Sequence, residues 1–285
     1  MKKIVKSLIK FFLKFKFLSK IIVKMYPMAT ESLFLRSIDV TSSRDVFLFR
    51  YTSVQEYLEI NHLPEECYKR YGSDYDGGYF LVDDINPNSK LLSFGVGPDI
   101  SFEAELSPKL RQVHLYDYSV STLPQDIYNS RFFMSKVSTI DTNDEIDVNT
   151  CYQILNDSSK ETILKCDIEG DELNVVSHIS PINLKNTSQI VLEIHNLNRI
   201  MADDFYSNLI KMLKNISLFH TPVFVNANNW DTYNLILNKP LPNTIEVTFL
   251  AKDKINKYKS VKVPSSPRSQ PNSRINPSIE LNFLP

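Results

Sequence analysis

The sequence predicts an α/β fold built on a mostly parallel β-sheet, with a helical extension at its N-terminal end. Short apolar runs alternate with helical patterns from residue 90 onward, and a Gly-x-Gly turn closes the first of these runs. Strands separated by helices indicate βαβ units, which place the strands side by side and parallel. The expected parallel strands cover residues 90–94, 112–117, 131–136, 162–168 and 189–195.

Two later β-rich segments are expected to complete this sheet. A helical pattern covers residues 203–215, and residues 218–225 and 244–251 then form two apolar runs. A polar loop that contains Asn228, Asn229 and Trp230 separates the two runs. Such a pair predicts antiparallel strands at the edge of an otherwise parallel sheet.

Composition divides the 285-residue chain into four parts. A basic segment comes first, then a mostly helical lead-in that contains an Asp-Gly-Gly-Tyr turn, then the α/β domain, and last a tail rich in Pro, Ser and Asn. The tail is expected to be extended, with residues 278–283 lying against the body. The four parts cover residues 1–27, 28–89, 90–263 and 264–285.

The basic segment is expected to form an amphipathic helix. Residues 1–25 carry eight lysines and no acidic residue, which leaves 24 basic residues against 33 acidic ones in the rest of the chain. Recurring lysines make a membrane span costly, and the segment lacks the continuous apolar run of a cleaved signal peptide. We expect residues 2–25 to lie on the anionic inner surface of a membrane, with packing against the body as the alternative.

The acidic body and the cysteines limit the function class further. A nucleic-acid-binding protein usually presents a basic surface, so we expect no nucleic-acid partner. Cys67, Cys151 and Cys166 are too few for a disulfide framework and form no CxxC pair, so they are expected to be reduced, buried thiols. We therefore expect a cytoplasmic protein that associates peripherally with the membrane, and its oligomeric state stays open.

The glycine turn after the first strand indicates a nucleotide-cofactor site. Gly95 and Gly97 lead into a helix that is expected to begin at Asp99 or Ser101. Glycine allows a positive φ and a close approach of a ligand to the backbone. A dinucleotide site would need a third glycine where Ile100 stands, and no P-loop pattern is present in the sequence.

Acidic residues end the neighbouring strands. Asp117 follows the second strand about 20 residues after the glycine turn, where a carboxylate can accept hydrogen bonds from both ribose hydroxyls of an adenosine ligand. A helix cap or a solvent-exposed aspartate is the alternative interpretation. Asp167 and Glu169 share one side of the segment over 162–170, together with Lys165, and this side is expected to face a polar cleft.

A second charged pair ends the next strand. Glu193 and His195 share one face of the strand over 189–195. Because ligands bind beyond the carboxyl ends of parallel strands, Asp167, Glu169, Glu193 and His195 together predict an active site. A structural cluster of ion pairs is the alternative.

Taken together, these motifs resemble the FkbM-like, methyltransferase-like group of S-adenosylmethionine-dependent enzymes. The resemblance covers residues 71–252 and departs from the generic Gly-x-Gly-x-Gly turn at Asp99, which takes the place of the third glycine. It depends on an ordered set of segments: Asp76-Gly-Gly-Tyr79, Ser93-Phe-Gly-Val-Gly97 with Ser101-Phe-Glu103, Leu164-Lys-Cys-Asp-Ile-Glu-Gly170, Leu192-Glu-Ile-His195 and Asn228-Asn-Trp230.

The resemblance implies a Rossmann-like, seven-stranded class I methyltransferase sheet and methyl transfer from S-adenosylmethionine. The acceptor would be a hydroxyl on a sugar or another small metabolite, in a role such as cell-surface glycan biosynthesis. Gly95 and Gly97 would then lie against the amino-acid end of the donor and Asp117 against its ribose. Gly77 and Gly78 complete the expected cofactor-binding residues.

The expected chemistry needs a positioned acceptor oxygen and a group that takes its proton. His195 is the expected general base, with Asp167 or Glu193 orienting it and Glu169 holding the acceptor. A divalent ion held by Asp167, Glu193 and His195 is compatible with these residue types, although no spacing demands a metal.

Two other function classes remain open at this point. One is a non-catalytic binding protein that has the methyltransferase fold and docks at a membrane. The other is an NAD-dependent oxidoreductase, against which the missing third glycine counts.

Overall fold

The computed structural model divides the chain into two compact units, Met1–Leu48 and Phe49–Pro285. Of the first unit, only the start of helix α4 (Ser43–Tyr57) is described. The expected basic helix over residues 1–27 and nearly all of the tail segment 278–283 therefore lie outside the described residues. The structure describes residues 43–156, 161–230, 233–236, 239–258, 271–276 and 279.

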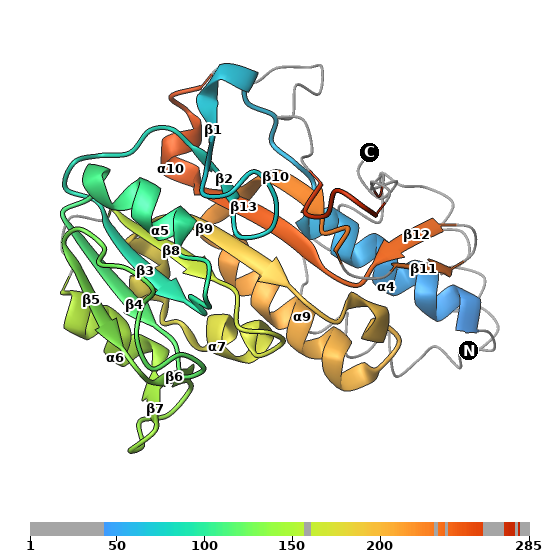
Figure 1. The fold of residues 1–285 in the computed structure, drawn as a ribbon. Coiled ribbons are helices and arrows are strands. Elements are labelled where there is room, and N and C mark those ends of the chain that lie inside the picture. Colours follow the sequence, from blue (N-terminus) through green and yellow to red (C-terminus); the bar gives the residue numbers. More distant parts are fainter. Residues whose placement is uncertain are drawn as a thin grey trace. The chain divides into compact units, whose positions relative to one another are not determined.

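A seven-stranded sheet forms the centre of the second unit, with the strand order β10-β13-β9-β8-β3-β4-β5 (Figure 1). Strands β5, β4, β3, β8 and β9 are parallel, and β13 runs antiparallel to both of its neighbours. The expected seven-stranded, mostly parallel α/β sheet with an antiparallel edge pair is confirmed. Its strands are β3 (Lys90–Phe94), β4 (Gln112–Tyr116), β5 (Ser130–Phe133), β8 (Thr162–Cys166), β9 (Thr187–Ile194), β10 (His220–Ala227) and β13 (Ile245–Ala251).

Helices cover one face of this sheet, and their apolar stripes explain why. In α9 the residues Leu209, Met212, Leu213 and Ile216 are buried at the spacing of one helix face. Helix α6 begins at a side-chain cap, where Asp147 accepts a hydrogen bond from the amide of Asn149 at 2.7 Å. The helices on this face are α6 (Val148–Leu155), α7 (Glu172–His178), α8 (Pro181–Lys185) and α9 (Asp203–Ser217).

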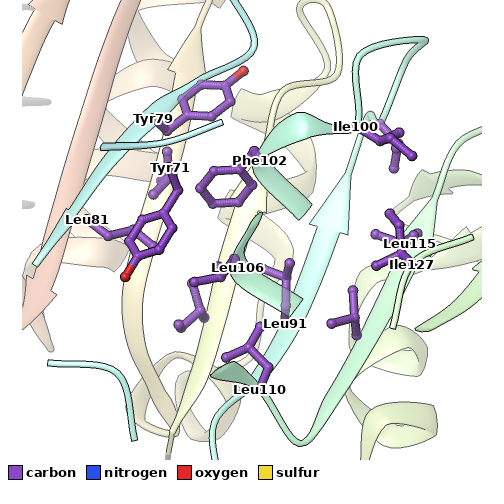
Figure 2. Close-up of a cluster of buried hydrophobic side chains, with 14 residues drawn as sticks. Tyr71, Tyr79, Leu81, Leu91, Ile100, Phe102, Leu106, Leu110, Leu115 and Ile127 are labelled. Carbon is purple, nitrogen blue, oxygen red and sulfur yellow. The ribbon is translucent and has the colours of Figure 1, made fainter. Parts of the chain in front are cut away.

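A two-stranded hairpin and a short helix cover the opposite face. Strands β1 (Tyr68–Tyr71) and β2 (Tyr79–Val82) pair antiparallel, and α5 (Ser101–Leu106) packs beside them. The rings of Tyr79 and Phe102, both labelled in Figure 2, pack edge to face with their centroids 5.4 Å apart. This buried cluster holds the hairpin against the sheet, and it also includes Leu91.

The remaining elements are short and lie outside the central sheet. One pair of strands follows β5, and another lies in the loop between β10 and β13. In the described residues, no helix is long and apolar enough to cross a bilayer. These elements are β6 (Lys136–Ser138), β7 (Glu145–Asp147), β11 (Tyr233–Ile236), β12 (Lys239–Pro242), α10 (Lys252–Ile255), and the single turns η1 (Glu65–Cys67), η2 (Ser107–Lys109) and η3 (Leu197–Arg199).

Three sequence expectations need correction. The lead-in before the sheet, expected to be mostly helical, contains the β1–β2 hairpin, because its Gly-rich turn joins two short strands. The strand expected over residues 131–136 ends at Phe133, and Lys136 begins β6 instead. The strand expected to reach Ile168 ends at Cys166, so Lys165 lies within the sheet and is buried.

The strand order creates a switch point at β3. The chain passes from β3 to β4 on one side and later returns to β8 on the other side of β3. Connections that diverge from adjacent parallel strands leave a crevice outside their carboxyl ends, and this crevice is the usual ligand site of open α/β sheets. Gly95 follows β3 directly, and Asp167 follows β8 directly.

Candidate active site

Three carboxyl groups, those of Asp167, Glu193 and Glu246, lie side by side at the carboxyl edge of the sheet and form what we call the carboxyl row. Glu246 of β13 is in register with Glu193 of β9, and Cys166 pairs with Leu192, which places Asp167 beside Glu193. Glu193 follows Val191 by two residues, so it shares the sheet face that carries the hairpin. Glu193 and Glu246 are buried, and such groups are costly to bury unless hydrogen bonds or protons compensate them.

The hydroxyl group of Tyr79 contacts two of these carboxyl groups. Its hydroxyl oxygen lies 2.8 Å from Oδ2 of Asp167 and 3.2 Å from Oε2 of Glu193. One hydroxyl proton cannot serve two carboxylates, so a second proton is needed among the three groups. Burial and the charges of Asp167 and Glu246 raise the pKa of Glu193 well above its usual value. Its surroundings therefore favour the protonated form of Glu193.

The polar loop after β10 completes the contacts of Glu193. The side-chain amide of Asn228 donates to Oε1 of Glu193 at 2.6 Å. Asn229 donates to the carbonyl of Ser273 at 3.1 Å, so the same loop also binds the segment 271–276. The Asn228–Asn229 motif singled out in the sequence thus reaches the carboxyl row directly.

His195 is held from one side and faces carboxylates on the other. Its Nδ1 lies 2.9 Å from Oε1 of Glu172, a fully buried residue at the start of α7. Its Nε2 lies 4.0 Å from Oδ1 of Asp167 and 3.9 Å from Oε1 of Glu193. Glu169 Oε2 is 3.6 Å away on a side chain that is 87% exposed. The orienting group is therefore Glu172, and not the expected Asp167 or Glu193.

Glu172 is itself fixed by the backbone. Its Oε1 accepts hydrogen bonds from the amides of Ile168 and Gly170 at 3.0 Å, and its Oε2 accepts from Gly170 at 3.0 Å as well. These amides lie in the loop after β8, where Glu169 has a φ of 59°. The loop and Glu172 together set the direction of the His195 ring.

The surroundings of His195 favour its charged form. Burial lowers the pKa of the imidazole, but the hydrogen bond to Glu172 and the charges of Glu172, Glu193 and Asp167 outweigh burial and raise the pKa to about 9. At neutral pH the ring of the ligand-free protein is therefore an imidazolium.

Lys165 connects the carboxyl row to the glycine turn. Its buried ammonium group donates a short hydrogen bond to the carbonyl of Gly95 and lies 3.6 Å from Oδ2 of Asp167. Burial lowers the pKa of Lys165, but the charges of Asp167, Glu103 and Glu193 outweigh this effect and raise it. Lys165 thus supplies a fixed positive charge inside an acidic site.

The two glycines of the turn are needed for different reasons. Gly95 has a φ of +74°, and a Cβ there would lie 1.6 Å from the carbonyl oxygen of Asp167. Gly97 has a φ of +61°, but a Cβ there would meet no atom of the described chain within 4 Å. Gly95 is therefore a packing requirement, whereas Gly97 borders open space where a ligand can approach.

Asp117 lies at the end of β4, beside this turn, as expected. Its Oδ2 accepts hydrogen bonds from the amides of Val96 and Gly97, both at 2.8 Å, and its Oδ1 accepts from the amide and hydroxyl of Ser119 at 2.6 Å. Burial raises the pKa of Asp117, but these hydrogen bonds outweigh burial and lower it. A role in binding ribose hydroxyls stays a prediction.

The Asp-Gly-Gly-Tyr turn lies next to the entry of α5. A Cβ at Gly77 would lie 2.6 Å from Oδ2 of Asp99, and a Cβ at Gly78 would lie 2.1 Å from the carbonyl of Ser73. Oδ1 of Asp99 accepts the amide hydrogen of Ser101 at 2.9 Å, where the helix was expected to begin. The turn is thus packed close to the glycine turn, although a cofactor contact of Gly77 and Gly78 stays a prediction.

The structure brings the two groups of expected site residues to one edge of the sheet. Asp167, Glu169 and Glu193 surround the imidazole of His195, and Asp167 also contacts the glycine turn. Gly95 and His195 therefore both lie next to Asp167 at this edge. Their catalytic and binding roles stay predictions.

Sequence reasoning missed several residues of this site. Glu172 carried a detectable signal, since it is an acidic residue in the first turn of a helix that follows a glycine. Tyr79 appeared only as the last residue of the Asp-Gly-Gly-Tyr motif, without a role, and Glu246 carried no signal, because its contacts depend on how β13 packs. Asn272, from the Pro-rich end, binds Glu246 with its side-chain amide. Burial raises the pKa of Glu246 to about 7, although Asn272, Asn226 and Arg70 lower it in part.

Comparisons with known proteins give no family. No family model matches the chain, and no curated protein matches it. Among solved structures, a dimethyladenosine transferase from Plasmodium falciparum is similar at 15% sequence identity and a TM-score of 0.35. The alignment spans 61% of this chain and 60% of that chain. The FkbM-like relation inferred from the motifs therefore stays a prediction.

The two glycines of the turn should respond differently to substitution. Gly95→Ala combines an unfavourable φ with a backbone clash, so we expect a loss of about 3 kcal/mol or more in the free energy of unfolding. Gly97→Ala suffers the unfavourable φ alone and should lose about 1–2 kcal/mol. Urea denaturation of both variants measures the difference. Equal losses would contradict the packing role of Gly95.

The pKa of His195 should depend on Glu172. An NMR titration with a chelator present should give a value near 9, well above the 6.5 of an unperturbed imidazole. Because the folded-state pKa is raised, the stabilisation by charged His195 is complete below pH 6.5 and is lost as the pH rises through about 9. Glu172→Gln should lower the pKa of His195.

A matched control is available in Asp147→Asn. Asp147 lies 2.9 Å from the exposed His178, so this variant removes an equivalent partner elsewhere in the chain. It should leave the titration of His195 unchanged. A His195 pKa near 6.5 in the wild-type protein, or one that Glu172→Gln does not move, would show that Glu172 does not hold the imidazolium.

Proposed function

We propose that this protein is an S-adenosylmethionine-dependent methyltransferase that methylates a hydroxyl group on a sugar or another small metabolite. The observation that carries the proposal is the contact between Gly95 and Asp167 at the switch point of the sheet. This contact places a nucleoside-type glycine turn directly beside a cluster of carboxyl and imidazole groups. A transfer between a bound donor and a bound acceptor needs these two parts next to each other.

The residues at the ends of β3 and β4 fit the methyl donor. S-Adenosylmethionine, when bound, supplies a methyl group on a positively charged sulfur. Gly97 borders open space, which allows a ligand to approach the backbone, and Asp117 holds the turn through the amides of Val96 and Gly97. Asp167 adds negative charge beside the turn, and this charge favours a cationic ligand.

The residues at the ends of β8 and β9 fit the acceptor. A hydroxyl group must lose its proton as its oxygen forms the new bond to carbon, so the site needs a proton acceptor within hydrogen-bond reach. Carboxyl oxygens of Asp167, Glu169 and Glu193 lie 4.0, 3.6 and 3.9 Å from Nε2 of His195. Because His195 is charged at neutral pH, we assign proton acceptance to the ionised carboxylates beside it, with Glu172 fixing the ring of His195.

The wider role is part of the same proposal. The lysine-rich segment 2–25 supports attachment to the cytoplasmic face of a membrane, which is where enzymes that modify surface glycans would meet their acceptors. The FkbM-like motifs support an O-methyltransferase. An NAD-dependent oxidoreductase is disfavoured, because Ile100 stands in place of the third glycine of the dinucleotide turn.

Calorimetry and methyl-transfer assays test the function together. We expect the protein to bind S-adenosylmethionine, and His195→Gln to lower turnover about 100-fold or more while donor affinity stays near the wild-type value. His178→Gln, which alters a histidine 46% exposed, is the matched control and should keep full activity. Unchanged turnover in His195→Gln would exclude His195 from the chemistry.

Two other results of the same calorimetry would replace the proposal. Binding of NAD in place of S-adenosylmethionine would favour the oxidoreductase. Donor binding without methyl transfer to any saccharide or metabolite hydroxyl in an acceptor screen would favour a non-catalytic protein docked at a membrane.

Gly97→Ala tests where the donor binds. The added Cβ projects into open space, so it should fill room that the donor needs and weaken donor binding about tenfold or more, the equivalent of about 1.4 kcal/mol. Circular dichroism should show a folded protein. Wild-type donor affinity in this variant would place the donor elsewhere.

A further inference from the structure

We propose that Nε2 of His195, Oδ1 of Asp167 and Oε1 of Glu193 bind a divalent transition-metal cation such as Mn²⁺ or Zn²⁺. The inference rests on the proposed function, because it places the cation where the acceptor hydroxyl would bind. There a cation would bind the hydroxyl oxygen and make its proton more acidic.

The distances from Nε2 of His195 to the two carboxyl oxygens suit a shared cation. Nε2 lies 4.0 Å from Oδ1 of Asp167 and 3.9 Å from Oε1 of Glu193. Both distances are too long for a hydrogen bond. Metal bonds to nitrogen and oxygen are about 2.0–2.2 Å long, so ligand atoms around one cation lie roughly 3–4 Å apart. The space between these atoms thus matches a cation better than a direct contact.

Neighbouring groups orient each of the three atoms. Glu172 binds Nδ1 of His195 at 2.9 Å, which leaves Nε2 as the ring nitrogen that faces the carboxylates. A carboxylate bound to the other ring nitrogen is the usual partner of a metal-binding histidine. Tyr79 contacts Oδ2 of Asp167 and Oε2 of Glu193, so the other oxygen of each carboxyl group is the one directed at His195. Oε1 of Glu193 also accepts a hydrogen bond from Asn228 at 2.6 Å, which leaves one of its lone pairs for a cation.

Glu172 also lies within reach of this group, but its contacts assign it a supporting role. Ligand atoms of Asp167, Glu172 and His195 all lie within 4.8 Å of one another. The oxygens of Glu172 already accept hydrogen bonds from two backbone amides and contact the His195 ring. Binding a metal would break these contacts. We therefore place Glu172 behind the ligands and not among them.

The charge and chemistry of the site favour a transition metal. Asp167, Glu169, Glu172 and Glu193 contribute four carboxyl groups, while Lys165 supplies one fixed positive charge beside them. An imidazole together with carboxylates suits Mn²⁺, Fe²⁺ or Zn²⁺ better than Ca²⁺ or Mg²⁺. In the cation-bound protein His195 is a ligand, and the exposed carboxylate of Glu169 takes over as the proton acceptor.

Electron paramagnetic resonance with Mn²⁺ tests the site directly. The signal of free Mn²⁺ should fall as the full-length, chelator-treated protein is added, with one ion bound per chain. His195→Gln and Asp167→Asn should each weaken binding about tenfold or more. Asp126→Asn, which alters an exposed carboxylate outside the site, should bind like the wild-type protein.

The outcomes separate this inference from the proposed function. Absence of Mn²⁺ binding would overturn the cation site. Equal binding by the wild-type protein and His195→Gln would also overturn it, because the ion would then be bound by exposed carboxylates elsewhere. Circular dichroism checks that both variants fold. If Asp167→Asn does not fold, the result for His195→Gln alone tests the cation site. Parallel calorimetry with S-adenosylmethionine tests methyl transfer separately, since Mn²⁺ binding without donor binding would keep the cation site and overturn the methyltransferase.

Discussion

The close approach of two loops at the carboxyl edge of the sheet constrains the rest of the site. Strands β3 and β8 are neighbours, and the chain must leave both of them at the same edge. The backbone of Asp167 passes so close to residue 95 that only glycine fits, and the amide of Asp167 donates to the carbonyl of Phe94 at 3.0 Å. The positions of the glycine turn and of the carboxyl row therefore depend on each other.

The position of the carboxyl row follows from this constraint, and its burial lowers the free energy of unfolding. Buried carboxyl groups on adjacent strands repel one another when charged, and an uncompensated buried charge is strongly destabilising. Hydrogen bonds with Tyr79 and Asn228 compensate Glu193, and burial favours its protonated form. Asn226 and Asn272 compensate Glu246. Groups that are costly to bury and yet so fully supported are typical of functional sites.

Most of the sheet could be predicted from the sequence, because strands buried on both faces appear as apolar runs. Strands β3, β4, β9 and β13 begin or end within two residues of the expected bounds. The glycine turn and the acidic strand ends could also be predicted. The two-residue alternation of strand side chains does not place Glu169 correctly, because the strand ends at Cys166 and Glu169 takes a positive φ.

The parts that could not be predicted depend on tertiary packing. The β1–β2 hairpin brings Tyr79 to the carboxyl row, and a mixed pattern of charged and aromatic residues did not reveal that hairpin. Asn272 reaches Glu246 from 26 residues further along the chain, where no periodicity marks it. The partner of His195 was expected among the strand residues, but Glu172 takes that place from the start of a helix.

A crystal structure with S-adenosylhomocysteine bound would test the central claim most directly, namely that the glycine turn and the carboxyl row form one site. We expect the ligand to contact Gly97 and Asp117, with its sulfur directed toward Asp167 and His195. A ligand that binds away from the ends of β3 and β8, or whose sulfur points away from Asp167, would contradict the claim.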